Sequence, residues 1–99
     1  DLERADYSVD IFARTLLANC EQAGKVVQNV TGKPAGESVS YEDLWRLTLL
    51  NYNAGAGCLA DAVQVARVNN LELTWKNIAD SLLPGCKPAV NYVEDISQE

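Results

Sequence analysis

Apolar residues recur at intervals of three and four along nearly all of this 99-residue chain, which is the spacing of one face of an α-helix. Val, Ile and Thr never alternate with polar residues for long enough to predict a strand. The pattern therefore predicts an all-α fold, with about five helices in a single domain over residues 1–99. Hydrophobic residues make up 47% of the chain and charged residues 22%, so there is enough apolar surface to form a core.

Glycine, proline and asparagine mark where these helices should end. We expect the first helix to start near residue 7 or 8 and to end between residues 24 and 32, with a loop over 31–39. Ser40 should begin the second helix, because Asp43 follows three residues later in a capping-box-like arrangement. The remaining helices are expected over residues 58–68, from about residue 74 to a turn at 83–85, and from Pro88 into an acidic tail.

All five predicted helices carry apolar residues that should form the core. The second helix is apolar on almost every side, which is typical of a helix at the centre of a domain. Each of the other four has one apolar face. In chain order these faces consist of Phe12, Leu16 and Cys20 with Ala13, Leu17 and Ala23 beside them; Leu59, Ala62, Val63 and Ala66; Trp75, Ile78, Ala79 and Leu82; and Ala89, Val93 and Ile96.

The charge and two absent residue types narrow the function. A net charge of −6 argues against nucleic acid as a partner, because phosphate binding needs an excess of cations. The chain has no His, which excludes Ser-His-Asp and Cys-His catalysis and most zinc sites. It has no Met, so we expect a processed product or a piece of a longer protein. No apolar run reaches the roughly 18 residues of a transmembrane helix.

The three cysteines, Cys20, Cys58 and Cys86, are widely spaced. None belongs to a Cys-x-x-Cys pair, so neither a metal site nor a thioredoxin-like motif is expected. The spacing suits one disulfide in an exported, extracytoplasmic protein. The third cysteine would then be a buried thiol or the partner of a segment outside this sequence. The alternative is three buried free thiols in a cytosolic domain.

The segment from Asn51 to Gly57, Asn-Tyr-Asn-Ala-Gly-Ala-Gly, is the most informative in the chain. It brings Tyr52 and Asn53 to a glycine-rich break at the end of a buried helix. Its small residues would let another chain approach the backbone closely, and the two polar side chains could stack on or hydrogen-bond to a polar ligand. The alternative is a corner between two helices, with glycine as the C-cap and Tyr52 filling the core.

The stretch Leu49–Gly57 also resembles the Ala-Tyr-Asn-Ala-Gly-x-Gly signature of the soluble lytic transglycosylases, relatives of goose-type lysozyme. These are α-helical, lysozyme-like enzymes that cleave the glycan strands of peptidoglycan. Residues 10–17 resemble the helix that precedes the signature, and residues 75–93 resemble the end of the domain, with its closing Tyr-Val pair. The similarity covers nearly the whole chain, and its specific part is the Tyr-Asn-Ala-Gly core.

The resemblance implies a role for each matching residue. Tyr52 would lie in the active-site groove and orient the catalytic acid or the sugar, and Asn53 would support the turn or contact a sugar. Ala54 and Gly55 would shape the backbone of the cleft, and Tyr92 would line it from the last helix. The implied partner is the glycan strand of peptidoglycan, and neither a cofactor nor a metal is expected.

The chain departs from the family pattern in three places. Ala56 stands where the family often has Pro. Cys58 and Cys86 are not general features of the family. They flank the third and fourth helices, so a Cys58–Cys86 disulfide would pin this helical pair to the last helix. The segment from Gly24 to Ser40 is longer than the usual connection and resembles an insertion.

A larger departure concerns the catalytic acid. The family uses one Glu as general acid and then base, in a Glu-Ser motif on an upstream helix that a Gly-Leu-Met-Gln-like stretch follows. Here the one Glu-Ser pair, at Glu37, lies in a Gly/Pro-rich stretch without that partner motif, so we interpret Glu37 as an exposed loop carboxylate. Glu42 and Asp43 are better explained as favourable charges at a helix start.

We therefore expect the C-terminal half of a lytic transglycosylase-like domain that lines one wall of a glycan groove. It would be a monomer or would contact the rest of its parent chain. The catalytic Glu is expected upstream of this sequence. The alternative is a non-catalytic helical module with a degenerate lysozyme-like fold that binds a glycan or a protein. A third interpretation is a small helical interaction domain that matches the signature by chance.

Overall fold

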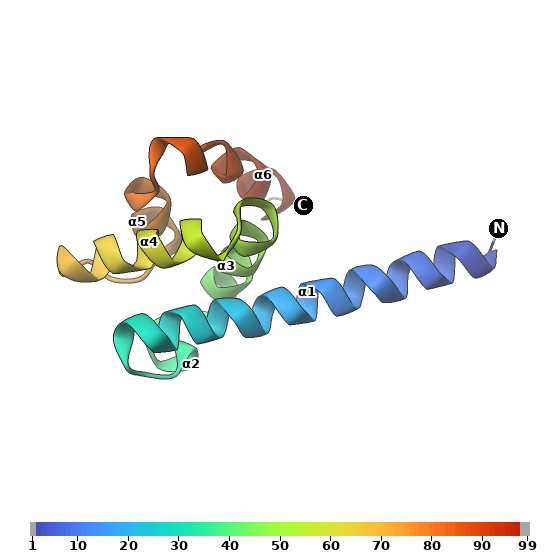
Figure 1. Cartoon of the computed structure of the whole chain (residues 1–99), viewed down its shortest axis with the longest axis horizontal. Helices are drawn as coiled ribbons and strands as arrows, with labels where there is room; N and C mark the ends of the chain where they lie inside the picture. The colour runs from blue at the N-terminus through green and yellow to red at the C-terminus, as the bar shows by residue number, and fades with distance from the viewer. Residues whose placement is uncertain (1, 98–99) are drawn as a thin grey trace.

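The computed structural model describes residues 2–97, with side chains from residue 10 onward, and shows an all-α fold without a strand in this range (Figure 1). Six α-helices occur in these residues, and a 3-10 helix, η1, precedes the last of them. Their bounds are α1 Leu2–Thr31, α2 Ala35–Ser38, α3 Tyr41–Ala54, α4 Ala56–Val68, α5 Trp75–Ser81, η1 Pro84–Cys86 and α6 Pro88–Ser97. The fold class predicted from the helical spacing is confirmed.

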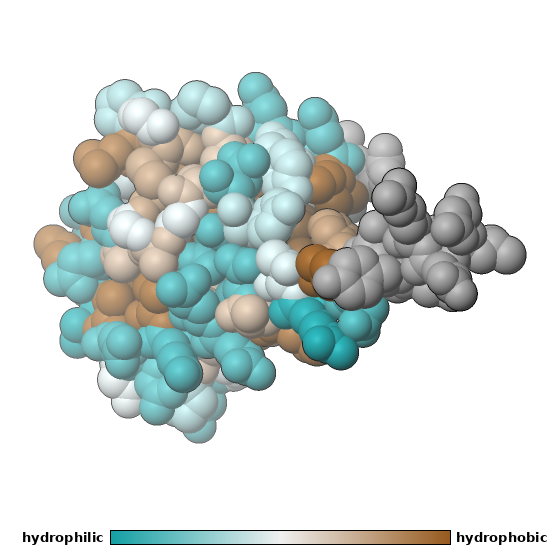
Figure 2. Space-filling model, turned by 45° about the vertical axis from the view of Figure 1, so that its right-hand side comes forward, coloured by the Kyte–Doolittle hydropathy of each residue, from teal (hydrophilic) through white to brown (hydrophobic). Residues whose placement is uncertain are grey.

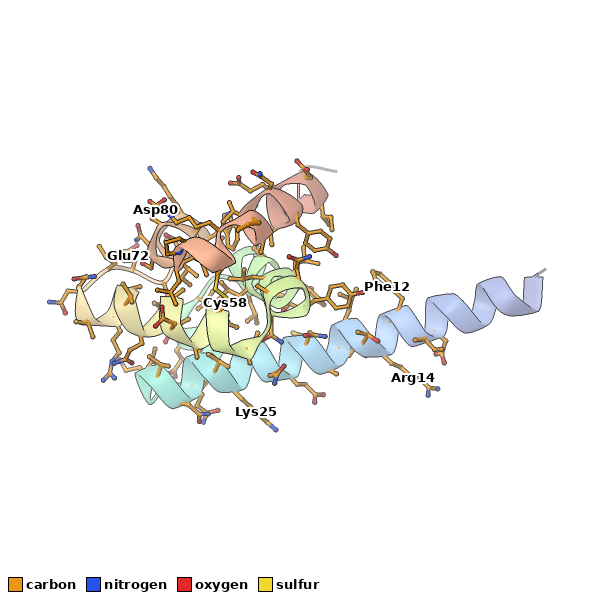
Figure 3. The ribbon with its side chains drawn as sticks, turned by 45° about the horizontal axis from the view of Figure 1, so that its top comes forward. Phe12, Arg14, Lys25, Cys58, Glu72 and Asp80 are labelled. Atoms are coloured by element: carbon orange, nitrogen blue, oxygen red, sulfur yellow. A yellow bond between two sulfur atoms is a disulfide. The ribbon has the colours of Figure 1, made fainter. Side chains whose placement is uncertain are left out.

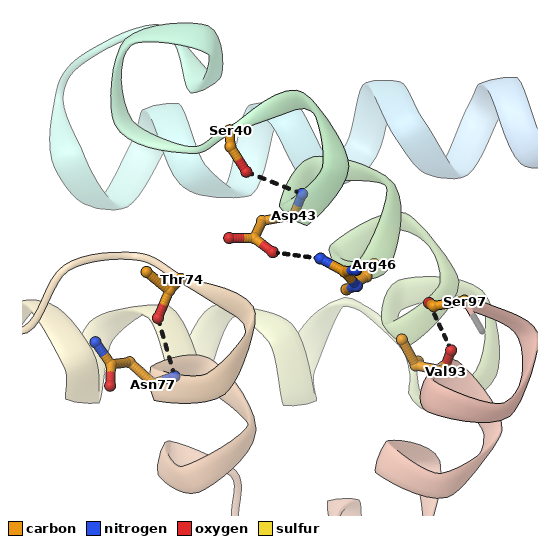
Figure 4. Close-up of polar contacts among 7 residues, drawn as sticks. All are labelled: Ser40, Asp43, Arg46, Thr74, Asn77, Val93 and Ser97. Carbon is orange, nitrogen blue, oxygen red and sulfur yellow. Dashed lines mark hydrogen bonds and ion pairs between the residues drawn. The ribbon is translucent and has the colours of Figure 1, made fainter.

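The central helix is α3, which contacts α1, α4, α5 and α6. Ser40 caps its N-terminus as predicted, because the Asp43 N–H donates to the Ser40 Oγ at 3.1 Å (Figure 4). Leu47 and Leu50 are fully buried, and each such side chain contributes roughly 1.5–3 kcal/mol by leaving water. Other helices complete the core with Ala23, Val27, Leu59, Val63, Ile78 and Val93.

The longest helix is α1, whose 30 residues extend roughly 45 Å. It starts at residue 2, earlier than predicted, and Figure 1 shows its N-terminal half extending beyond the other helices. The predicted core stripe is wrong at Phe12 and Leu17, which are exposed, and Phe12 projects from α1 in Figure 3. Leu16 and Cys20 are half-buried, and Ala23, the last residue of the stripe, is fully buried as predicted.

The connection between α1 and α3 contains a helical turn that was predicted to be a loop. Gly32 ends α1 with a φ of 75°, and α2 then forms one turn in which the Val39 N–H donates to the Ala35 carbonyl at 2.9 Å. Val39 is buried in the core, so the turn is held by tertiary packing. A single turn carries no periodic pattern, which explains why the sequence did not indicate it.

The last three α-helices, α4, α5 and α6, begin close to their predicted first residues. Thr74 caps α5, because the Asn77 N–H donates to the Thr74 Oγ1 at 3.2 Å (Figure 4). Pro88 is the first residue of α6. Val93 is buried as predicted, but Ile96 is exposed. The buried face of α6 therefore ends at Val93 and does not extend to Ile96, as the spacing of its apolar residues had predicted.

The surface of the described residues mixes polar and apolar side chains. Figure 2 shows brown hydrophobic atoms among teal hydrophilic ones rather than a single apolar face. None of the helices between residues 2 and 97 combines the length and hydropathy that a membrane span requires.

A disulfide joins Cys58, in the first turn of α4, to Cys86 in η1, with 6.0 Å between the two Cα atoms (Cys58 is labelled in Figure 3). The predicted pairing is confirmed, and the alternative of three free thiols is wrong. Cys20 is the free cysteine and lies half-buried on α1. The bond ties the start of α4 to the residues that lead into α6.

Removing this disulfide should destabilise the fold strongly. The bond closes a loop with a sequence separation of 28, for which loop-closure entropy gives roughly 3–4 kcal/mol. We expect the double variant Cys58→Ser, Cys86→Ser to lose about this much free energy of unfolding in urea denaturation. Cys20→Ser is the matched control and should change it far less. Equal losses in the two proteins would contradict the prediction.

Candidate functional site

Tyr52 and Tyr92 are forty residues apart in the sequence but lie against each other in the structure. Tyr52 is in the last turn of α3 and Tyr92 is in α6, and these two helices pack together. The ring centroids are 6.5 Å apart and the ring planes differ by 27°, which is a stacked arrangement. Tyr92 is half-buried, whereas Tyr52 is 43% exposed. The pair presents an aromatic surface to solvent, so the interpretation of Tyr52 as a core-filling residue is wrong.

The glycine-rich break forms the corner between α3 and α4. Gly55 is the C-cap of one helix and the N-cap of the other: its N–H donates to the Asn51 carbonyl at 2.9 Å, and its carbonyl accepts from the Leu59 N–H at 3.3 Å. Its φ of 94° and ψ of 163° are rarely adopted by residues with a side chain. A Cβ at Gly55 or Gly57 would meet no atom within 4 Å. Gly55 is therefore required by backbone conformation, and no part of the described chain approaches it closely.

Gly55→Ala should lower the free energy of unfolding by about 1–3 kcal/mol, because a Cβ is strained at this φ. Gly57→Ala is the matched control. Gly57 lies in the first turn of α4 without an unusual φ, so Ala should leave stability unchanged or raise it slightly. Urea denaturation followed by circular dichroism measures both variants. Equal stabilities would show that the corner does not depend on glycine at position 55.

Asn51 is a further residue of the site, and its sequence pattern did not indicate a separate role for it. Its side chain is only 3% exposed, and its Nδ2 donates to the Asn19 Oδ1 at 2.7 Å and to the Gln22 Oε1 at 2.8 Å. These bonds join α3 to α1 one residue before Tyr52, so they fix the end of α3 that carries the tyrosine. The available signal was a polar residue late in an apolar helix, since a buried amide requires hydrogen-bond partners.

Asn51→Asp should destabilise the protein by about 1–3 kcal/mol at neutral pH. It replaces two N–H donors by a buried carboxylate oxygen that faces two amide oxygens, with almost no change of shape. Asn53→Asp makes the same chemical change at an exposed position and should cost at most about 1 kcal/mol, the effect of a negative charge in the last turn of a helix. Thermal and urea unfolding of the two variants give the comparison. A small effect at both positions would refute a positioning role for Asn51.

The other residues that were predicted to form the site surround the same corner. Asn53 is exposed at the end of α3. Ala54 is the last residue of α3 and packs against the core. The structure therefore places Tyr52, Asn53, Ala54 and Gly55 in one continuous turn, with only the first two available to a ligand through their side chains.

The candidate acids lie away from this turn. Glu37 is exposed and lines an open hollow with Arg67 and Leu73, where α2 faces the connection between α4 and α5. Neither tyrosine lines that hollow. Asp43 forms an ion pair with Arg46 at 2.8 Å in the first turns of α3, which agrees with its interpretation as a helix-start charge. Over residues 10–97, carboxylate and cysteine side chains do not gather in a group that could hold a metal ion.

Comparisons with protein-family models, with curated proteins and with solved structures find no match to this chain. The resemblance to the transglycosylase signature therefore depends on the matching residues themselves. The geometry adds that the tyrosine of the signature stacks on the tyrosine of the closing helix. What the site offers chemically is a solvent-facing aromatic pair with an exposed amide next to it.

Proposed function

We propose that this chain forms one wall of a glycan-binding groove in a lytic transglycosylase-like protein that acts on peptidoglycan. Tyr52 and Tyr92 would pack against sugar rings, and the Asn53 amide would hydrogen-bond to a sugar. The catalytic Glu would come from a segment upstream of this sequence, and the protein would act outside the cytoplasm.

The stacked tyrosine pair carries this proposal. The resemblance assigns Tyr52 and Tyr92 to one cleft on the basis of two separate parts of the sequence, and the rings meet at 6.5 Å. A chance match to the signature in α3 would give no reason for an aromatic residue of α6 to lie beside it. The disulfide supports a location outside the cytoplasm, because disulfides persist in oxidising compartments.

We expect the 99-residue chain to bind a hexamer of β-1,4-linked N-acetylglucosamine, and Tyr52→Ala to raise the Kd roughly three- to tenfold by removing the exposed ring. Tyr52→Phe keeps the ring and should bind almost as well as the unsubstituted chain. An NMR titration measures all three proteins. Val68→Ala is the control, since Val68 is an exposed apolar residue on α4 and should not affect the Kd.

Absence of binding by the unsubstituted 99-residue chain would favour the third interpretation, a small helical interaction domain that matches the signature by chance. An unchanged Kd in Tyr52→Ala would show that the tyrosine pair does not contribute to sugar binding. Either result would overturn the proposed function.

Digestion of peptidoglycan with these 99 residues alone should release no anhydro-muropeptides, because the general acid is proposed to lie elsewhere. Release of such products would refute that location of the acid.

In a longer protein that contains this chain and the proposed upstream segment, Tyr52→Phe and Tyr92→Phe distinguish the two leading alternatives. Loss of turnover with binding retained supports the enzyme, whereas binding without turnover in the unsubstituted protein supports the non-catalytic module.

A further inference from the structure

A groove runs between the first half of α3 and the last turn of α6. It encloses about 470 Å³, and its apolar lining consists of Tyr41, Trp45, Leu49 and Ile96. A smaller hollow of about 170 Å³ adjoins it, because Arg46 and Ser97 line both. The smaller hollow also includes Trp75 and Glu94. We call the two hollows together the α3–α6 groove.

The aromatic lining of the α3–α6 groove continues the surface of the tyrosine pair. Four residues at intervals of four, four and three lie on one face of α3. They are Tyr41, Trp45, Leu49 and Tyr52. Tyr41 is 75% exposed, and its ring meets the Trp45 ring edge to face, with centroids 6.2 Å apart. On α6, Ile96 follows Tyr92 by one turn, so the pair and the groove form one strip along roughly 16 Å of α3.

The polar lining combines a negative charge with an unused donor. Arg46 is paired with Asp43, which leaves Glu42 and Glu94 without an ion pair within residues 10–97 (Figure 4 shows the Arg46–Asp43 pair). Such a lining repels polyanions. Trp75 is 8% exposed, and its Nε1–H is buried with no acceptor in the described part of the chain. A ligand that displaces the atoms covering this N–H and supplies an acceptor oxygen would relieve the cost of that unpaired donor.

We propose that the α3–α6 groove is a second sugar subsite, in which a neutral β-linked N-acetylamino-sugar chain continues from the Tyr52–Tyr92 pair. The identity of this chain rests on the proposed function. A sugar ring has an apolar C–H face, which packs on exposed aromatic rings, and a rim of hydroxyl and N-acetyl oxygens, which accepts from the Trp75 Nε1–H. A partner helix would need a side-chain oxygen at the right position to accept from Trp75, whereas every sugar of the chain carries hydroxyl and N-acetyl oxygens.

Intrinsic fluorescence tests the proposal directly, because the two tryptophans of the chain, Trp45 and Trp75, both line the groove. The N-acetylglucosamine hexamer should cause a saturable change in tryptophan emission, with the same Kd that NMR gives from the signals of Tyr52 and Tyr92. Tyr41→Ala removes an exposed ring without opening the core and should raise the Kd roughly three- to tenfold. The control Val68→Ala should leave both signals and the Kd unchanged.

A second variant tests the unused donor. Trp75→Phe keeps an aromatic side chain and removes the indole N–H, so it should also raise the Kd, with Trp45 left as the fluorescent reporter. Circular dichroism and the Tm show whether this variant remains folded. If it unfolds, Tyr41→Ala decides the question by itself.

Three outcomes would overturn the proposal, and they differ in their consequences for the proposed function. If the NMR signals of Tyr52 and Tyr92 shift while tryptophan emission and the Kd of Tyr41→Ala stay unchanged, the groove is not a subsite and the proposed function stands. If neither the tyrosines nor the tryptophans respond, both proposals fail. If the tryptophans respond and the tyrosines do not, the groove binds sugar but is not continuous with the pair.

Discussion

The burial of α3 among α1, α4, α5 and α6 is the packing constraint on which the rest of the structure depends. A helix that is surrounded in this way must be apolar on several sides, and a polar residue can point inward only where another element supplies a partner. The Nδ2 of Asn51 meets that condition through its bonds to Asn19 and Gln22. Since Tyr52 and Gly55 follow on the same helix, the geometry of the candidate site depends on the packing of the core.

Local sequence signals account for most of the helices. Ser40, Thr74 and Pro88 begin helices in the structure because a side-chain oxygen that accepts a backbone N–H, or a proline at the first position, acts within one turn. The spacing of apolar residues indicates which of them share a helix face, but not which other element covers that face. Phe12 and Leu17 therefore have the spacing of core residues and are nevertheless exposed.

Only those residues of the candidate site that match a known family motif could be predicted from the sequence. Tyr52 and Tyr92 were assigned to one cleft by the resemblance, and spacing alone could not have paired two side chains forty residues apart. The α3–α6 groove was missed for a related reason. Trp45 belongs to a helix that is apolar almost all round, and the sequence does not show that α6 covers only part of that side. Such partial coverage is a property of tertiary packing.

The Cys58–Cys86 disulfide also changes the covalent route between the two tyrosines. Along the backbone the route from Tyr52 to Tyr92 passes through α4 and α5, whereas through the sulfur atoms it needs only six residues on either side of the bond. Loop-closure entropy grows with the logarithm of path length, so the shorter route raises the effective concentration of one ring at the other by about fivefold, or roughly 1 kcal/mol. The oxidised chain is thereby biased toward the aromatic pair even while the two intervening helices are still unfolded.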